Sequence, residues 1–280
     1  MTRRIDAHQY FWRLLRGDYG WLRPGLGPIH RNFMPEDLEP LLRKAGISGT
    51  VLVQAAPTEA ETHFMLSLAR DHAFIEGVVG WVDFEAADAP ARIARLAADP
   101  KLRGLRPMIQ DLPDDDWMLR PELDAAFRAL IQHGIVFDAL VLPRHLANLS
   151  ELLARHPGMA TIIDHCAKPA IAAADLAGWG GDMRRLAAET DAYCKLSGLV
   201  TEAGAGWSVE TLRPCVELVL DSFGPDRLIW GSDWPVCLLA ADYASWLEAT
   251  HVLLRDCTEG ERDAILGGNA IRAYGLRNDG

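Results

Sequence analysis

The sequence predicts an α/β fold in which eight parallel strands, each followed by a helix, form one (β/α)₈ TIM barrel over residues 1–280. Short apolar runs alternate with amphipathic segments along almost the whole chain, as in repeated βαβ units. Successive runs start mostly about 25–35 residues apart, which leaves room for one strand, one helix and two loops. No linker or low-complexity tract divides the 280 residues, a length that suits a single barrel.

The predicted strands are the apolar or β-branched runs that begin each repeat. They span residues 4–12, 49–56, 75–83, 104–110, 135–142, 160–166, 192–198 and 227–233. Several are apolar on both faces, as strands buried beneath helices must be. The rival fold is a doubly wound open sheet with a Gly-rich nucleotide turn after its first strand. The chain has no G-x-G-x-x-G motif, so the closed barrel is favoured.

Seven amphipathic segments predict helices after the strands. They span residues 35–45, 59–73, 90–98, 122–133, 146–156, 182–190 and 209–223. Several stop at glycine, for example at Gly46, Gly134 and Gly224, a common C-terminal signal. Two connections after strands are long, residues 13–34 and 111–118. Because such loops gather at the carboxyl ends of barrel strands, we expect both at the mouth, where active sites form.

Composition excludes several classes of protein. The net charge of −11 and the lack of a Lys/Arg cluster argue against nucleic-acid binding. Five scattered cysteines without a C-x-x-C pair argue against a disulfide framework and fit a reducing compartment. No apolar run reaches 18 residues and no signal core follows the N-terminus, so we expect a cytoplasmic protein without a membrane partner. A homo-oligomer is compatible with the sequence.

Ionisable residues near the ends of barrel strands need a reason, because the interior favours apolar side chains. In the first strand, Asp6, His8 and Tyr10 share one face by alternation. If that face points inward, a carboxylate, an imidazole and a phenol converge at the mouth. The alternative is that Gln9 and Phe11 point inward instead.

The sixth predicted strand ends in Asp164, His165 and Cys166. Alternation places Asp164 and His165 on opposite sides, so that only one of them faces the pocket. Cys166 has no activating pattern around it and is interpreted as core packing.

The eighth strand ends in Gly231-Ser232-Asp233-Trp234-Pro235. A carboxylate where an apolar strand emerges can take a proton from water or bind a cation. The alternative is that Asp233 caps the following helix. No G-x-S-x-G elbow and no H-E-x-x-H motif is present, so serine-esterase and zincin chemistry have little support.

Weaker candidates for contacts with substrate also fall near predicted strand ends or on the mouth loops. Polar side chains there can bind hydroxyls or a carbonyl, although each alone is more often a solvated or capping residue. Tryptophan can stack on a sugar-like ring, although aromatic packing between loops explains it equally well. These residues are Gln54, Asp83, Arg106, Lys195 and Trp117.

Three segments, residues 6–12, 163–169 and 231–235, resemble the amidohydrolase superfamily, in its branch of sugar-lactone hydrolases such as L-fuconolactonases and L-rhamnono-lactonases. Further matches are residues 103–106, 195–199 and 269–270, and the likeness runs in order across residues 4–276. It implies an enzyme, a carboxylic-ester hydrolase that opens the ring of a small aldonolactone. In such an enzyme Asp233 activates the water and then protonates the leaving ring oxygen.

The resemblance also implies that His8 and His165 lie in the pocket as metal ligands or carbonyl polarisers. The superfamily pattern in the first strand is His-x-His, and here Tyr10 takes the second position. A phenol with a pKa near 10 is a poor zinc ligand. We therefore expect either one zinc ion on His8, His165 and Asp233 or no metal, and no organic cofactor. His165, with Tyr10 or a metal on His8, would stabilise the oxyanion.

Three rival functions stay open at this point. A 2-pyrone-4,6-dicarboxylate lactonase would need several arginines at the mouth, and only Arg106 and Arg144 are candidates. A metal-dependent decarboxylase of the same superfamily is weakened by Tyr10. A carbohydrate-binding barrel without catalysis is opposed by the presence of Asp233 and both histidines.

Overall fold

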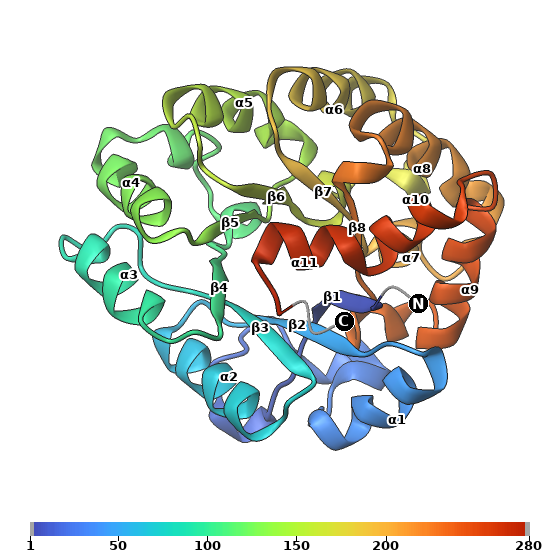
Figure 1. Ribbon diagram of the computed structural model, residues 1–280, viewed down its shortest axis with the longest axis horizontal. Helices are drawn as coiled ribbons and strands as arrows, with labels where there is room; N and C mark the ends of the chain where they lie inside the picture. Colours follow the sequence, from blue (N-terminus) through green and yellow to red (C-terminus); the bar gives the residue numbers. More distant parts are fainter. Residues whose placement is uncertain (1–2, 278–280) are drawn as a thin grey trace.

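The computed structural model describes residues 3–277, which form one eight-stranded parallel sheet in the order β1 to β8, surrounded by helices (Figure 1). The predicted (β/α)₈ barrel is confirmed. The strands are β1 (Ile5–Gln9), β2 (Gly49–Val53), β3 (Ile75–Gly80), β4 (Leu102–Leu105), β5 (Val136–Ala139), β6 (Thr161–Ile163), β7 (Tyr193–Leu196) and β8 (Leu228–Trp230). Most are shorter than the predicted runs, because the chain leaves the sheet at their carboxyl ends and turns into the mouth.

The seam between β8 and β1 is formed by residues just beyond β8. Asp233 N donates to His8 O at 2.8 Å, and Tyr10 N donates to Trp234 O at 2.8 Å. A parallel bridge also joins Gln9 and Trp234. This seam places the side chains that follow β8 directly beside those at the end of β1.

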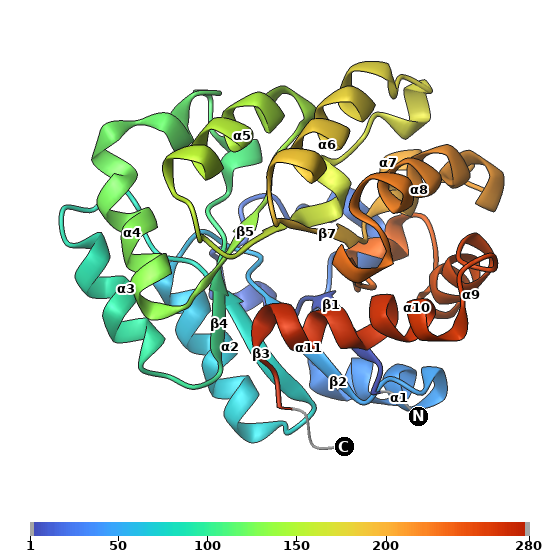
Figure 2. The ribbon, with the colours of Figure 1, turned by 45° about the horizontal axis from the view of Figure 1, so that its top comes forward.

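The helices pack around the outside of the strands (Figure 2). They are α1 (Pro35–Ala45), α2 (Glu59–Asp71), α3 (Ala89–Ala97), α4 (Asp124–His133), α5 (Leu146–Arg155), α6 (Ala177–Glu189), α7 (Leu199–Ala203), α8 (Val209–Phe223), α9 (Tyr243–Leu253), α10 (Glu259–Asp263) and α11 (Asn269–Tyr274). All seven predicted helices are present, with ends shifted by a few residues. None of the helices in the described part of the chain is long and apolar enough to cross a membrane.

Helix α6 begins five residues before its predicted start at residue 182. Its first turns contain three glycines, which lower intrinsic helix propensity. A side chain at Gly180 would lie 2.6 Å from Leu218 Cδ1 of α8, so glycine there lets the two helices approach without moving the end of Leu218. Packing therefore overrides propensity at this helix start.

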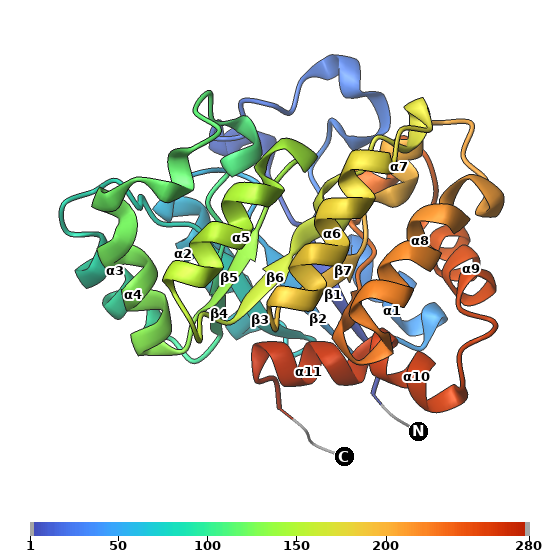
Figure 3. The ribbon, with the colours of Figure 1, turned by 90° about the horizontal axis from the view of Figure 1, so that it is seen from above.

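The two ends of the barrel differ. Helix α11 crosses the amino-terminal end near both termini, whereas the long loop after β1 folds over the opposite end (Figure 3). That loop contains two 3₁₀ segments, Leu14–Arg16 and Pro24–Ile29. The floor of the barrel is thus closed by a helix and its mouth is covered by loops.

Candidate active site

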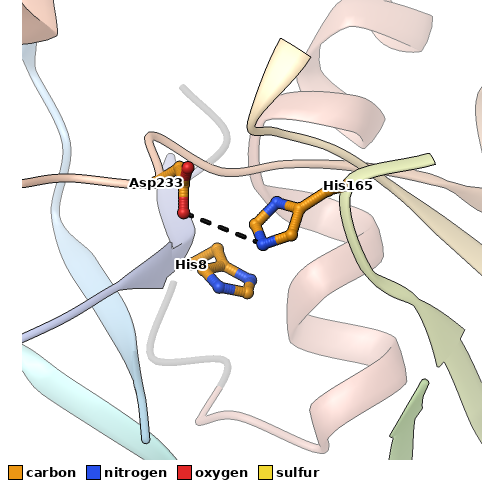
Figure 4. A group of neighbouring side chains, drawn as sticks. All are labelled: His8, His165 and Asp233. Atoms are coloured by element: carbon orange, nitrogen blue, oxygen red, sulfur yellow. Dashed lines mark ion pairs between the residues drawn. The ribbon is translucent and has the colours of Figure 1, made fainter. Parts of the chain in front are cut away.

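Three ionisable side chains from distant parts of the chain meet at the mouth of the barrel (Figure 4). His8 lies on β1, His165 follows β6 and Asp233 follows β8, and one ligand atom from each lies within 4.8 Å of the others. His165 Nε2 is 3.8 Å from Asp233 Oδ1, and the rings of His8 and His165 have centroids 4.4 Å apart. All three side chains are buried, so the cluster is shielded from bulk solvent.

The backbone after β6 explains how His165 reaches this cluster. Residues 165–168 all have φ between 51° and 57°, in the left-handed region that side chains with a Cβ rarely adopt. A side chain at Gly198 would lie 2.7 Å from His165 Nδ1, so glycine there makes room for the ring. Strand alternation does not continue through this turn, and both Asp164 and His165 contact His8. The prediction that only one of them faces the site is wrong.

Asp6 does not join the cluster. The pairing of β1 with β2 shifts register between Asp6 and Gln9, which breaks the alternation that groups Asp6 with His8 and Tyr10. Asp6 Oδ1 accepts from Ser232 N at 2.8 Å, and Oδ2 accepts from Tyr243 OH of α9 at 3.0 Å. The expected convergence is therefore wrong for Asp6, while His8 Nε2 and Tyr10 OH do meet, at 2.7 Å.

A fully buried ionic layer lies beneath His8. Lys195 Nζ of β7 is 2.7 Å from Asp138 Oδ1, 2.9 Å from Asp164 Oδ1 and 3.1 Å from His8 Nδ1. Asp138 Oδ1 also accepts from Tyr274 OH of α11 at 2.6 Å. The ammonium of Lys195, a predicted contact for substrate, is thus surrounded by groups of the protein itself.

Arg106 joins this layer to the mouth. Its Nη1 lies 3.1 Å from Asp164 Oδ2, 3.3 Å from His8 Nε2 and 3.4 Å from Tyr10 OH. The side chain is only 2% exposed, and Nη2 donates to Gln54 O. Arg106 therefore supplies a fixed positive charge beside His8 and Tyr10.

Of two other predicted contact residues, Gln54 contacts Arg106 and Trp117 lies on the wall of a separate hollow. Gln54 Nε2 donates to Arg106 O at 2.9 Å and thereby supports the backbone of that residue. Trp117 Nε1 donates to Glu85 Oε1 at 2.6 Å, and its ring lines a neighbouring hollow. Sequence reasoning missed Asp138, Asp164 as an ion-pair partner, and Tyr274. The signal for Asp138 was an acidic residue inside an otherwise apolar strand.

Burial controls the charges of the cluster. It raises the pKa of Asp233 to about 7, although the nearby Lys168 and Arg106 act to lower it. Burial and then the charge of Lys195 lower the pKa of His8 to about 3, and burial also lowers the pKa of His165. Burial raises the pKa of the Tyr10 phenol. Near neutral pH the site thus holds two neutral imidazoles, a protonated phenol and a carboxyl that is readily protonated or deprotonated.

The residues of the cluster fit one divalent cation. Two imidazole nitrogens and a carboxylate oxygen form the three-ligand set of many catalytic zinc sites. Asp233 Oδ1 is buried and has no hydrogen-bond donor within residues 3–277. His165 Nδ1 contacts Ser197 Oγ at 2.9 Å, which leaves Nε2 directed toward Asp233, as a metal-bound imidazole requires. This is the one such cluster among the described residues.

A parallel (β/α)₈ barrel with histidines and an aspartate at the carboxyl ends of β1, β6 and β8 defines the class of barrel hydrolases. Residues 5–276 match the model of the amidohydrolase family, and the chain belongs to that family. The resemblance seen in the sequence is thereby confirmed.

Two L-fucono-1,5-lactonases are similar to this chain over nearly the whole length of both proteins. The chain is 48% identical to an L-fucono-1,5-lactonase of Burkholderia ambifaria, covering 98% of this chain and 96% of the relative. It is 40% identical to an L-fucono-1,5-lactonase of Burkholderia multivorans, with the same coverage of each. A crystal structure of a Burkholderia multivorans amidohydrolase with bound zinc superposes with a TM-score of 0.94 at 38% identity, covering 99% of this chain and 100% of that one.

Proposed function

We propose that this protein is a lactonase that opens the ester ring of a small, uncharged sugar lactone of the L-fucono-1,5-lactone type. The observation that carries the proposal is Asp233, a buried carboxyl with a pKa near 7 placed against two neutral imidazoles at the barrel mouth. The 48% identity to an L-fucono-1,5-lactonase over nearly the whole chain supports the class of substrate.

Asp233 acts first as a general base. In its deprotonated form it takes a proton from a water molecule, whose oxygen bonds to the carbonyl carbon of the lactone. The resulting tetrahedral oxyanion collapses, the bond between the carbonyl carbon and the ring oxygen breaks, and the protonated Asp233 returns its proton to that oxygen. The product is the open-chain hydroxy acid. A pKa near 7 suits both transfers, because the group can gain and lose a proton near neutral pH.

Arg106, Tyr10 and His165 stabilise the oxyanion. The guanidinium and the protonated phenol are hydrogen-bond donors that lie within 3.4 Å of each other, in a buried site where such donors are effective. His165 is held in place by Ser197 on its far side. This adds Arg106 to the oxyanion donors expected from the sequence.

Lys195 is a positioning residue in this mechanism. Its ammonium is shared among Asp138, Asp164 and His8, so it acts through His8 and does not touch the ring hydroxyls. The pKa of Asp164 lies well below its usual range, since Lys195 and His8 outweigh the effect of burial. This fixed charge pattern holds the His8 ring in one orientation.

A single zinc ion would be held by His8, His165 and Asp233, and when bound it would polarise the ester carbonyl and lower the pKa of water. An ester needs less electrophilic help than an amide, so the protein groups described above carry out the steps themselves.

The alternative substrate, 2-pyrone-4,6-dicarboxylate, is disfavoured because too few arginines are available at the mouth to bind its two carboxylates. Of the two candidates, Arg144 is ion-paired with Asp115 at 2.7 Å on the exposed rim. Only Arg106 remains to meet two substrate carboxylates, and an unpaired buried carboxylate is costly.

The test is a panel of lactones assayed by acid release, before and after chelation and with zinc restored. We expect L-fucono-1,5-lactone to be opened with a kcat/KM at least about 10²-fold above that for 2-pyrone-4,6-dicarboxylate. Faster turnover of the pyrone would overturn the substrate assignment while leaving the role of Asp233 standing. No turnover of any lactone would overturn the proposed activity.

A further inference from the structure

The hollow lined by Trp117 has a volume of about 570 Å³ and opens at the mouth of the barrel. Its walls come from the segments that follow β1, β2, β3 and β4. They combine aromatic side chains with carboxylates, namely Trp21, Trp81, Trp117, Asp18, Asp83 and Glu85. None of the residues that line this hollow takes part in the steps of lactone hydrolysis described above.

The hollow is joined to the hydrolytic cluster through the segment after β4. Pro107 and Met108 line it, and they follow Arg106 directly in the chain. Gln54 Nε2 contacts both Arg106 O, at 2.9 Å, and Met108 Sδ, at 3.0 Å. Arg106 Nη1 in turn lies 3.3 Å from His8 Nε2. A ligand group in the hollow would therefore lie against the same mouth segment that carries Arg106 of the hydrolytic cluster.

The aromatic walls are held in place before any ligand binds. Trp21 Nε1 donates to Ala55 O at 2.7 Å, and Trp117 Nε1 donates to Glu85 Oε1 at 2.6 Å. Both indole N–H groups are thus used by the protein, and the ring of Trp21, which is 36% exposed, offers apolar surface, whereas Trp117 is buried behind the wall. Flat apolar surface bordered by carboxylate acceptors is the environment that the C–H face and the hydroxyls of a sugar require.

Two of the four carboxylates that line the hollow are neutralised by ion pairs. Asp18 pairs with Arg16 at 2.6 Å, and Glu85 pairs with Arg120 at 3.0 Å, while Asp83 and Asp111 also line the hollow. Carboxylates accept hydrogen bonds from hydroxyls whether or not they are paired. The chemistry therefore fits a polyhydroxylated ligand.

The volume of the hollow indicates that it has room for a second sugar unit. A cavity of about 150 Å³ already holds a benzene ring, so the hollow exceeds what the distal end of a single lactone ring needs. We propose that it is a subsite for a second sugar unit, and that the enzyme opens lactones of aldobionic acids, in which a glycosyl group is attached to the aldonolactone. This inference rests on the proposed lactonase function. Water still adds to the ester carbonyl and the ring oxygen still leaves with a proton, while the glycosidic bond stays intact.

The test compares lactobiono-1,5-lactone with glucono-1,5-lactone, which share the reacting ring and differ by one galactosyl group. L-Fucono-1,5-lactone serves as the reference for lactonase activity itself. We expect the wild-type kcat/KM for the disaccharide lactone to equal or exceed that for glucono-1,5-lactone. In Trp21→Ala the ratio of the two should fall at least about tenfold, the effect of losing one stacking surface.

Trp207→Ala is the matched control, since Trp207 is a partly buried tryptophan outside the hollow whose Nε1, like that of Trp21, donates to a backbone carbonyl, that of Ala240 at 2.9 Å. Its ratio should stay within about twofold of wild type. Turnover of L-fucono-1,5-lactone with at least tenfold slower opening of lactobiono-1,5-lactone than of glucono-1,5-lactone would overturn the subsite. An unchanged ratio in Trp21→Ala would also overturn it. Failure to open any of the three lactones would instead overturn the proposed function.

Discussion

The mouth of the barrel and the ionic layer beneath it both contain buried carboxylates, yet these carboxylates have opposite properties. Asp233 at the mouth has a pKa raised to about 7 by burial. Asp164, one layer deeper and equally buried, has a pKa well below the usual range, because Lys195 and His8 outweigh burial. Direct ion pairs with Lys195 and Arg106, and not a greater depth of burial, separate the structural carboxyl of Asp164 from the reactive carboxyl of Asp233.

This difference assigns the two layers different tasks. In the lower layer, ion pairs and hydrogen bonds run from Tyr274 on α11 through Asp138 and Lys195 to His8. In the upper layer, Asp233 Oδ1 has neither a hydrogen-bond donor nor a Lys or Arg ion pair in the described part of the chain. A preorganised lower layer holds the upper one in place for chemistry.

The largest expected effect on stability comes from breaking the lower layer with Lys195→Met. Asp138 and Asp164 would lose the ammonium between them, and removing one partner of a buried ion pair costs about 3–5 kcal/mol. The free energy of unfolding in urea measures this loss. The control is Lys168→Met, which removes a partly exposed pair with Glu202 at 3.8 Å and should cost no more than about 1 kcal/mol. Equal losses in the two variants would contradict a special role for the lower layer.

A smaller effect is expected from Tyr274→Phe. The substitution removes the hydroxyl that donates to Asp138 at 2.6 Å, and a hydrogen bond to a charged group contributes about 1.5–3 kcal/mol. Urea unfolding measures it, with Tyr193→Phe on β7, a partly exposed tyrosine, as the control expected to change by less than about 0.5 kcal/mol. If Tyr274→Phe left the free energy of unfolding unchanged, α11 would not support the lower layer.

The smallest step, about 1 kcal/mol per pH unit, concerns Glu61 of α2, which tests the same rule where this helix meets the loop after β1. Burial raises its pKa from 4.5 to about 7, although Tyr19 and Arg16 act to lower it. Between about pH 4.5 and 7 the folded protein keeps this proton and the unfolded chain releases it. The stability from Glu61 is therefore complete below pH 4.5 and is lost as the pH rises toward 7, by about 1 kcal/mol per unit.

Glu61→Gln should remove this pH dependence, because the amide resembles the protonated acid. Melting temperatures of both proteins at several pH values between 4.5 and 7.5 measure the difference. Parallel curves for the two proteins would show that Glu61 is ionised in the fold throughout this range.

The sequence was sufficient to place the eight strands in order and to single out His8 and Asp233, because apolar runs and polar residues at strand ends are local signals. It did not show that Asp164 and His165 lie on the same side, since alternation holds only while a strand continues and the chain turns left-handed at His165. It also grouped Asp6 with His8, because an irregular register in β1 has no local signal.

Contacts between residues far apart in the chain could not be predicted from the sequence, for a different reason. Tyr274 and Asp138 are 136 residues apart, and only the closed barrel with α11 across its floor brings them together. Lys195 was singled out as a candidate substrate contact because it falls near the end of a strand. Its ion pairs with Asp138 of β5 and with Asp164, just after β6, could not be predicted, since only the closed barrel brings the three residues together.

The central claim is that Asp233 is the general base, and the pH dependence of kcat/KM for L-fucono-1,5-lactone in wild type and Asp233→Asn tests it most directly. In wild type kcat/KM should rise as the pH increases through about 7, where Asp233 loses its proton. In Asp233→Asn, kcat/KM should fall at least about 10²-fold and should no longer rise with pH, while the circular dichroism spectrum stays unchanged. A variant that keeps more than a tenth of the wild-type rate, or the same pH profile, would remove Asp233 from the mechanism.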